Sequence, residues 1–398
     1  MISPLMPNYN RIDVSFSHGE GAWLVASDGR RFLDFGAGIA TSSLGHGHEG
    51  LSRTIAEQAG RVMHVSNLYR VPQAERLAER LVGASFADSV FFCNSGAEAN
   101  EALVKAFRRT MADEGKPERY RVICAEGAFH GRTLAMISAT GNAKYLAGFG
   151  PAVDGFDHVP FNNLNALRMA ITPETAGILV EPIQGEGGVR PADAAYLQGL
   201  RAAADEFGLL LGFDEVQSGM GRTGRLFAHE WAGVQPDAVS TAKGIGGGFP
   251  LGAMLARERV AKALVPGSHG TTYGGSPLAC AAGNAVLDVL LAPGFLDGVV
   301  ASGDRFRAGL DGLVHRYPDV FSAVRGQGLL QGLVCLVPNG EVQAACMNEG
   351  LLVVAAGENV VRLIPPLIVG DAEIDEALLR LDGAARRCRP SLMMNAAK

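Results

Sequence analysis

The stretch Leu209-Leu210-Leu211-Gly212-Phe213-Asp214 decides how this chain folds. It follows Gly208, a residue type common at helix ends, and its apolar part predicts a short strand buried on both faces, as in a parallel sheet. Asp214 would then leave the carboxyl end of that strand, which is the edge where open α/β sheets bind ligands. A carboxylate there can keep a pyridine nitrogen protonated, or it can cap the next turn. These residues alone leave both interpretations open.

Lys243 stands in a second unusual context, the run Val239-Ser240-Thr241-Ala242-Lys243-Gly244-Ile245-Gly246-Gly247-Gly248. The chain has only six lysines, and this one passes directly from a strand-like run into a glycine-rich turn. A primary amine held in this way can form a Schiff base with an aldehyde cofactor. The alternative is a surface lysine beside a flexible loop.

The run Asn94-Ser95-Gly96-Ala97 indicates an anion site. It follows a strand-like run, residues 89–93, and opens a helix that extends to about residue 111. Ser95 would cap this helix, and the small residues after it expose backbone N–H groups where the helix dipole favours an anion. The buried face of the helix is predicted by apolar residues at four-residue spacing, namely Leu103, Phe107 and Met111.

These and other segments resemble those of the class III pyridoxal-phosphate-dependent aminotransferases. The matching segments follow the family's order over nearly the whole chain; they are residues 92–100, 129–133, 181–188, 213–217, 223–224, 243–244 and 270–275. Residues 325–329 and 359–366 favour the acetylornithine branch of the family. The resemblance implies an α/β, fold-type-I transferase. It would have a large domain with a mostly parallel sheet and a smaller α/β domain built from both termini.

The resemblance also implies how pyridoxal 5′-phosphate would be bound. Lys243 would hold the cofactor covalently, and Asp214 would pair with its pyridinium nitrogen. Val216 and Phe129 would pack on the two ring faces, which suits apolar and aromatic side chains. Gln217 would reach the phenolic oxygen of the ring.

Further residues are implied in phosphate and substrate binding. The cofactor set would also include Ser95, Gly96, Ala97 and Glu215, and Thr272 would come from the second subunit of a homodimer. Arg132 would bind a substrate carboxylate, a task that suits the bidentate guanidinium. Arg362 would bind a second carboxylate, with Glu186 as its removable partner, and Thr271 would lie at the substrate.

The implied reaction moves the ω-amino group of N2-acetylornithine to 2-oxoglutarate. The products would be N-acetylglutamate 5-semialdehyde and glutamate, in arginine biosynthesis. Succinylornithine, ornithine and 4-aminobutyrate remain alternative donors. Residues 41–43 lack the tyrosine that ornithine aminotransferases place near the substrate carboxylate, which argues against free ornithine.

Two other patterns are poorer guides to function. Residues 219–224 match the dinucleotide fingerprint, but they do not directly follow a strand, so a nicotinamide-dependent oxidoreductase is an unfavoured alternative. A cofactor-binding protein without activity is another alternative class. His46 and His48 lie in a glycine-rich loop without spaced partners, so we interpret them as turn residues and expect no metal.

The composition of the chain limits which partners and which cellular location are expected. With 398 residues, 47% hydrophobic content and a net charge of −6, the chain can bury a large core, and nothing suggests nucleic acid or a membrane as a partner. The six cysteines form no regular framework and there is no signal-peptide pattern, so a cytoplasmic protein is expected.

Alternating strands and helices predict the domain organisation. Residues 20–35 read as a hairpin turning at residues 28–29, and strands are expected at 89–93, 121–125, 177–181, 209–213, 238–241 and 251–256. A helix at 194–207 implies parallel crossovers, and strands at 321–336 and 351–363 precede a final helix from Asp371. We therefore expect a small domain made of residues 1–58 and 295–398, and a large domain made of residues 59–294.

Overall fold

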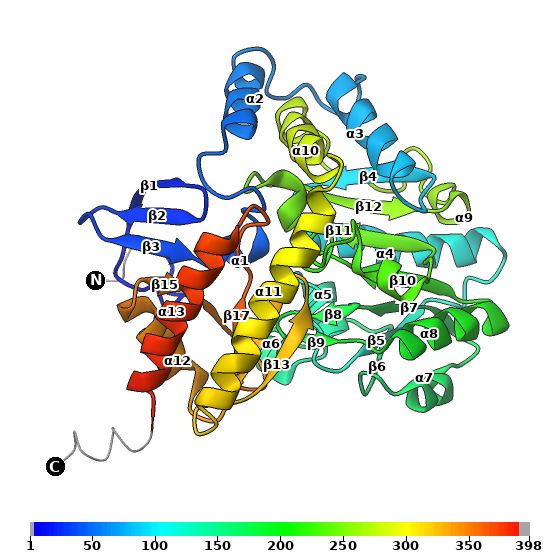
Figure 1. Cartoon of the computed structure of the whole chain (residues 1–398). Helices are drawn as coiled ribbons and strands as arrows, with labels where there is room; N and C mark the ends of the chain where they lie inside the picture. Colours follow the sequence, from blue (N-terminus) through cyan, green and yellow to red (C-terminus); the bar gives the residue numbers. More distant parts are fainter. Residues whose placement is uncertain (1–3, 390–398) are drawn as a thin grey trace.

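A seven-stranded sheet forms the centre of the large part of the molecule. The structure, a computed structural model, describes residues 4–389 (Figure 1). The strand order is β4 (Ser89–Cys93), β12 (Gly252–Ala256), β11 (Ala238–Thr241), β10 (Leu210–Asp214), β7 (Thr175–Val180), β5 (Arg121–Ala125) and β6 (Phe156–Val159). Only β12 is antiparallel to its neighbours, so the other six strands have their carboxyl ends at one edge. This arrangement confirms the predicted fold class; β6, at the sheet margin, was not predicted.

Helices cover both faces of this sheet because alternate strand residues point to opposite sides. One cluster joins Val122, Leu179 and Leu210 to α4 (Gly96–Asp113) and includes residues of α5 (Leu134–Thr140) and α9 (Glu258–Ala261). The other joins Ile123, Ile178 and Leu211 to α8 (Ala194–Phe207), and includes residues of α3 (Pro72–Gly83), α7 (Leu164–Ala170) and α10 (Pro277–Leu290).

Helix α4 packs very close to the strands. Its predicted apolar face is fully buried, at Leu103, Phe107 and Met111. A Cβ at Gly212 of β10 would lie 2.9 Å from Leu103 Cδ2, and one at Gly177 of β7 would lie 2.6 Å from Phe107 Cδ2. Glycine at these two strand positions therefore lets the helix approach the sheet, which fixes the start of α4 relative to the carboxyl edge of the strands.

The two ends of the chain meet in a second, smaller region, where the blue and red segments of Figure 1 lie together. Strands β1 (Phe16–Glu20), β2 (Trp23–Ala26) and β3 (Arg31–Asp34) form a sheet that β15 (Leu351–Leu352) extends by pairing with β3. A further sheet has the order β13 (Phe321–Gln327), β14 (Leu330–Cys335), β17 (Val360–Leu363) and β16 (Val354–Ala356). The helices of this region are α1 (Ala37–Ala40), α11 (Phe295–Arg316), α12 (Asn339–Asn348) and α13 (Asp371–Arg387), whereas α2 (Glu49–Ala59), which follows α1 in the chain, packs against α10 of the large region (Figure 1).

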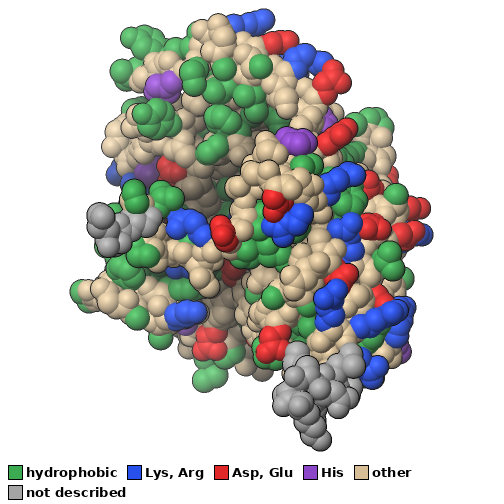
Figure 2. Space-filling model, turned by 90° about the vertical axis from the view of Figure 1, so that its left-hand side faces the viewer, with side chains coloured by type: hydrophobic (Ala, Val, Ile, Leu, Met, Phe, Trp, Pro, Cys, Tyr) green, Lys and Arg blue, Asp and Glu red, His purple; other side chains and the backbone are tan. Residues whose placement is uncertain are grey.

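The β3–β15 pairing supports the expected division of the chain, and we propose the same boundaries after residues 58 and 294. Residues 1–3 and 390–398 of the outer parts lie outside the described residues. The face of the molecule that Figure 2 shows carries acidic and basic side chains interspersed with one another.

The two patterns that we set aside have structural roles. Residues 219–224 form turns and not the start of a helix, and a Cβ at Gly224 would lie 2.3 Å from Val300 Cγ2 of α11, so this glycine permits close packing. His46 Nε2 lies 2.8 Å from Asp34 Oδ2, and His48 Nδ1 accepts a hydrogen bond from Leu51 N at the start of α2. Within residues 4–389, no group of three or more His, Cys, Asp or Glu side chains could hold a metal ion.

No single helix of the described chain is long and apolar enough to cross a membrane. Helices α10 and α11 meet the length and composition criteria only together, and the pair is bent by 72°. Every cysteine is free and buried.

Candidate active site

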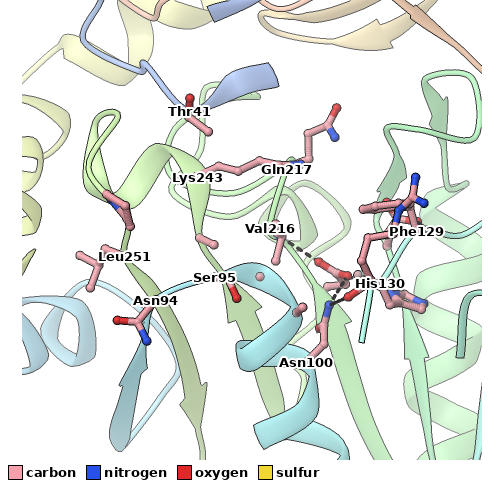
Figure 3. A pocket seen from close by; sticks show the side chains of 18 of the residues that line it. Thr41, Asn94, Ser95, Asn100, Phe129, His130, Val216, Gln217, Lys243 and Leu251 are labelled. Carbon is pink, nitrogen blue, oxygen red and sulfur yellow. Dashed lines mark hydrogen bonds and ion pairs between the residues drawn. The ribbon is translucent and has the colours of Figure 1, made fainter. Parts of the chain in front are cut away.

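A cavity of about 400 Å³ opens at the carboxyl edge of the large sheet (Figure 3). Its walls come from the loops after β4, β5, β7, β10 and β11, from the segment that leads into β12, and from the N-terminal region. The lining residues are Thr41, Asn94, Ser95, Gly96, Ala97, Asn100, Phe129, His130, Gly131, Arg132, Glu181, Asp214, Val216, Gln217, Ala242, Lys243, Gly248, Phe249, Pro250 and Leu251. The strand ends therefore bring together predicted residues that are more than 140 positions apart in the sequence.

Lys243 enters the cavity from the end of β11. It opens a short 3-10 turn, η2 (Lys243–Gly246), with a φ of 49°, a left-handed conformation that L residues rarely adopt. Ser43 Oγ donates a hydrogen bond to Gly244 O (2.9 Å), which ties this turn to the N-terminal segment. Within the described chain, the amine forms no hydrogen bond or ion pair. Burial and then the charge of Arg362 lower the pKa of Lys243, against the carboxylates of Glu186, Asp214 and Glu181. The amine is therefore poised to react as a nucleophile.

Asp214 is held at the floor of the cavity by three groups. Its Oδ2 atom accepts a hydrogen bond from Asn100 Nδ2 (2.7 Å) and lies 2.8 Å from His130 Nδ1, while its Oδ1 accepts one from Val216 N (3.0 Å). The side chain is 3% exposed. Asn100 also donates to His130 O and accepts from Ser240 Oγ, so one amide joins α4, β11 and the loop after β5. The carboxylate is thereby fixed in direction, as a partner for a ring nitrogen must be.

The start of α4 forms the anion-binding end of the cavity. Ser95 is the N-cap: its Oγ accepts a hydrogen bond from Glu98 N (3.3 Å) and contacts Glu98 Oε2 at 2.8 Å. Gly96 and Ala97 follow as the first helical residues, where backbone N–H groups have no partner inside the helix. A Cβ at Gly96 would lie only 2.6 Å from Val216 Cγ1, so glycine is required for this close approach.

Two apolar side chains flank the space between the anion end and Asp214. Val216 lies two residues beyond Asp214, and Phe129 stands in the loop after β5, where its backbone N–H donates to Glu181 Oε2 (3.0 Å). Glu181 is buried, and its pKa is raised by burial and then by the charge of Asp214. Val216 and Phe129 thus supply apolar surface to the same cavity that Asp214 lines.

A partly buried ion pair adjoins the cavity through Gln217. Arg362 of β17 is fully buried, and its Nη1 atom donates to Glu186 Oε1 and Gln217 Oε1, both at 2.6 Å. Its Nε and Nη2 atoms find no partner in the described structure. Burial acts to raise the pKa of Glu186, but the charge and hydrogen bond of Arg362 outweigh it and the pKa is lowered overall. Glu186 follows the short strand β8 (Ile183–Gln184), which pairs with β9 (Arg190–Pro191).

Among residues 4–389, Arg132 is the only arginine that lines the cavity, and it is exposed at the mouth. Its guanidinium carbon lies 4.0 Å from the ring centre of Tyr145 and 5.4 Å from that of Phe129. Tyr145 belongs to the short helix α6 (Ala143–Leu146).

Thr271 and Thr272 do not line the cavity of their own chain. Thr271 Oγ1 accepts hydrogen bonds from Asn94 Nδ2 and Gly274 N, both at 3.3 Å, so this loop is tied to the residue that precedes the N-cap of α4. Thr272 is exposed.

The assignment of Glu215 to the cofactor set stays a prediction, and its side chain points elsewhere in this structure. Its carboxylate does not line the cavity but turns toward the 3-10 helix η1 (Ala228–Ala232). There it accepts hydrogen bonds from Ala228 N (2.9 Å), His229 N (2.8 Å) and Ser218 Oγ (2.7 Å). Glu215 therefore fixes the turn after β10.

Three residues of the site were missed from the sequence: Asn100, Glu181 and Tyr145. Asn100 could have been recognised from the sequence, because it stands on the apolar face of α4, three residues before Leu103. An amide that is buried there needs polar partners. Glu181 directly follows β7, so it stands at the carboxyl edge of the sheet as Asp214 does. No sequence pattern around Tyr145 indicated a role at the site.

Comparison with known proteins identifies the family. The model for aminotransferase class-III matches residues 5–384. The acetylornithine aminotransferase of Brucella melitensis is 56% identical over 386 residues, covering 97% of this chain and 96% of the relative. That of Gloeobacter violaceus is 50% identical over 387 residues, covering 96% of each chain.

Solved structures agree in fold. N-acetylornithine aminotransferase from Stenotrophomonas maltophilia superposes with a TM-score of 0.84 at 37% identity, covering 98% of each chain. Ornithine aminotransferase from Toxoplasma gondii, solved with partial occupancy of PLP at its active site, gives a TM-score of 0.93 at 30% identity, covering 98% of this chain and 93% of that one. The cavity with its lysine, its aspartate and its helix N-terminus thus belongs to a known architecture, and the chain is a member of the class-III aminotransferases.

Proposed function

We propose that this aminotransferase moves the ω-amino group of N2-acetylornithine to 2-oxoglutarate, giving N-acetylglutamate 5-semialdehyde and glutamate. The relatives named acetylornithine aminotransferase, at 50–56% identity over nearly the whole chain, support this donor. The observation that carries the proposal is the pair of arginines at the site, one open at the mouth and one buried against Glu186. Such an arrangement serves a donor with one carboxylate and an acceptor with two. In the cell this reaction would serve arginine biosynthesis in the cytoplasm, where free buried thiols such as these persist.

The residues present fit pyridoxal 5′-phosphate. The unpaired amine of Lys243, the fixed carboxylate of Asp214 and the free N–H groups of Gly96 and Ala97 match an aldehyde, a ring nitrogen and a phosphate. When bound, this cofactor would supply an electron-withdrawing ring that stabilises negative charge on the substrate carbon next to the transferred nitrogen.

Each group of the chain then has a defined task. Lys243 would hold the cofactor covalently and, once displaced by substrate, would carry a proton as general base and acid. Asp214 would keep the ring nitrogen protonated, with Asn100 and His130 holding it in direction. Val216 and Phe129 would exclude water from the two ring faces.

Gln217, Ser95 and the threonine loop complete the proposed cofactor set. Gln217 lines the cavity and accepts a hydrogen bond from Arg362. From there it would reach the phenolic oxygen of the cofactor ring. Ser95 would fix the helix start that receives the phosphate. Thr271 would lie near the substrate through its contact with Asn94.

A homodimer would complete the phosphate site. Thr272 is exposed on a loop that Asn67 binds through Thr271 O (3.0 Å) and Gly274 O (3.1 Å). Residues 62–69 reach this loop through Asn67 and through the ring contact of His64 with Tyr273. Exposed apolar side chains of these two segments are Val62, Met63, Leu68, Tyr69 and Tyr273. We propose that a second copy covers this surface and receives Thr272 at its phosphate site, as two-fold symmetry would allow.

Turnover with different donors tests the proposed function. The purified protein should have a visible absorbance band that borohydride removes, and addition of N-acetylornithine should convert the band in a single turnover. Comparison of acetylated, succinylated and free ornithine and 4-aminobutyrate at equal concentrations would identify the donor. A faster reaction with any of the last three would overturn the assignment to N-acetylornithine.

A further inference from the structure

Arg132 is held by aromatic rings and not by a carboxylate. Its guanidinium carbon lies 4.0 Å from the centre of the Tyr145 ring, within the range of a strong cation–π contact. Phe129 lies on it more loosely, at 5.4 Å, and the two rings meet edge to face at 5.9 Å and 85°. Within the described residues, Arg132 forms no ion pair and no side-chain hydrogen bond.

Arg132 and Arg362 have different kinds of partner, and the difference affects how each can bind a carboxylate. Arg362 is neutralised by Glu186 at 2.6 Å, so any incoming carboxylate must first displace that partner. A ring under the face of a guanidinium attracts the cation but occupies none of the N–H groups at its edge. Arg132 can therefore accept a bidentate carboxylate without losing a contact.

The position of Tyr145 is set by its own segment of chain. Helix α5 ends at Gly141, which has a φ of 68°, and a Cβ there would lie 2.4 Å from His158 Nε2. Asn142 then caps α6 by accepting hydrogen bonds from Lys144 N through Oδ1 (2.9 Å) and from Tyr145 N through its carbonyl (2.9 Å). The ring thus approaches Arg132 from an element that does not line the cavity.

We propose that Tyr145 is a positioning residue that orients Arg132 for the carboxylate shared by both substrates. This inference rests on the proposed function, in which N-acetylornithine and 2-oxoglutarate each present a carboxylate at the mouth of the site. Because that carboxylate is common to both half-reactions, Arg132 needs a permanent support. Arg362 would bind a carboxylate of only one of the two substrates, so its support, Glu186, must be removable.

The test measures the apparent Kd and the limiting rate of each half-reaction by single-turnover absorbance. Tyr145→Leu should raise the apparent Kd for both substrates roughly 3- to 30-fold and leave the limiting rates nearly unchanged. Tyr145→Phe keeps the ring and should behave as wild type. Leu146→Ala, on the same short helix, is the control for disturbance of α6 and should leave both values unchanged.

A double-mutant cycle separates positioning from general damage. In an Arg132→Ala background, Tyr145→Leu should cause no further loss, because the side chain that it orients is absent. An equal loss in that background, or an unchanged apparent Kd in Tyr145→Leu alone, would overturn the inference.

Failure of the proposed donor gives a different result. In that case wild-type enzyme would not react with N-acetylornithine. The 2-oxoglutarate half-reaction of enzyme loaded with pyridoxamine phosphate would still report on Tyr145.

Discussion

Arg362 Nη1 lies 2.6 Å from Glu186 Oε1 although the arginine is fully buried and the glutamate is not. The pair therefore has one fixed member in β17 and one member in a loop. Glycines at 185, 187 and 188 flank Glu186, and glycine can adopt backbone conformations that other residues rarely reach. Opening of the pair is expected to proceed by movement of Glu186.

Removal of Glu186 should affect the two half-reactions unequally. In Glu186→Ala the guanidinium of Arg362 would be uncompensated, so N-acetylornithine should react more slowly and unintended amino acids should react through their α-amino groups. The reaction with glutamate, whose carboxylate would take the place of Glu186, should lose much less. Single-turnover spectra of each half-reaction measure this, and equal losses in both would exclude Glu186 as the removable partner of Arg362.

Lys243→Ala should abolish transamination while leaving the other contacts of the cofactor site in place. The rate should fall roughly 10³-fold or more, since both the covalent attachment and the proton carrier are lost. Lys262→Ala is a matched control, because Lys262 is exposed and its ion pair with Glu258 lies on the surface. Borohydride reduction should attach the cofactor permanently to the wild type and to the control, and mass spectrometry would detect the added mass. Near-normal turnover in Lys243→Ala would contradict the assignment.

The pKa of Lys243 should move in opposite directions when the two members of the buried pair are changed. Arg362 contributes to lowering this pKa and Glu186 contributes to raising it. Loss of the cation in Arg362→Met should therefore shift the pH dependence of cofactor attachment toward higher pH, since more base is needed to free the amine. Glu186→Gln should shift it toward lower pH. Stopped-flow absorbance of apoprotein mixed with pyridoxal phosphate across a pH series gives both midpoints, and shifts of the same sign would refute the assignment of these charges.

Asn100 should matter for the cofactor more than for the fold. Asn100→Leu leaves Asp214 without one donor and Ser240 without its acceptor, which should cost about 1–3 kcal/mol in the free energy of unfolding. It should also weaken pyridoxal phosphate binding. Thr110→Val is the control, since Thr110 is a buried polar residue of the same helix whose hydroxyl donates only to Ala106 O. If both variants bound the cofactor as wild type does, Asn100 would be only a packing residue.

Mixed dimers test the role of Thr272. Lys243→Ala and Thr272→Asp chains should each give poorly active homodimers. Refolded together they should recover about a quarter of wild-type activity, because half of the dimers would contain one intact composite site. Absence of recovery would place Thr272 within the site of its own chain.

Local patterns predicted the strands and the residues that follow them. The apolar run that ends at Asp214 and the strand that precedes Lys243 are contiguous in sequence, so their place at the sheet edge could be inferred from the rule for open α/β sheets. The edge strand β6 was missed because Phe156-Asp157-His158-Val159 is neither apolar nor alternating.

Contacts between distant segments could not be predicted in the same way. Asn100 meets Asp214 only because α4 crosses the sheet beside β10, and Tyr145 meets Arg132 only because the chain turns at Gly141. The direction of the Glu215 side chain could not be predicted for a similar reason: adjacent residues after a strand point in different directions, and the partners of the Glu215 carboxylate lie in η1. The family resemblance supplied roles for residues, but not the direction of each side chain.

The single reversed strand of the large sheet has a mechanical consequence for Lys243. Chain that leaves β11 at Thr241 returns in β12 at Gly252, and Thr241 stands opposite Ala253 in the antiparallel pair. Residues 242–251, which include Lys243, are therefore attached at both ends to paired strands of the sheet. This attachment restricts movement of the Lys243 backbone when the amine is released. The travel needed for each catalytic cycle is therefore confined to the four methylene groups of the lysine side chain, and the amine always returns to the same place.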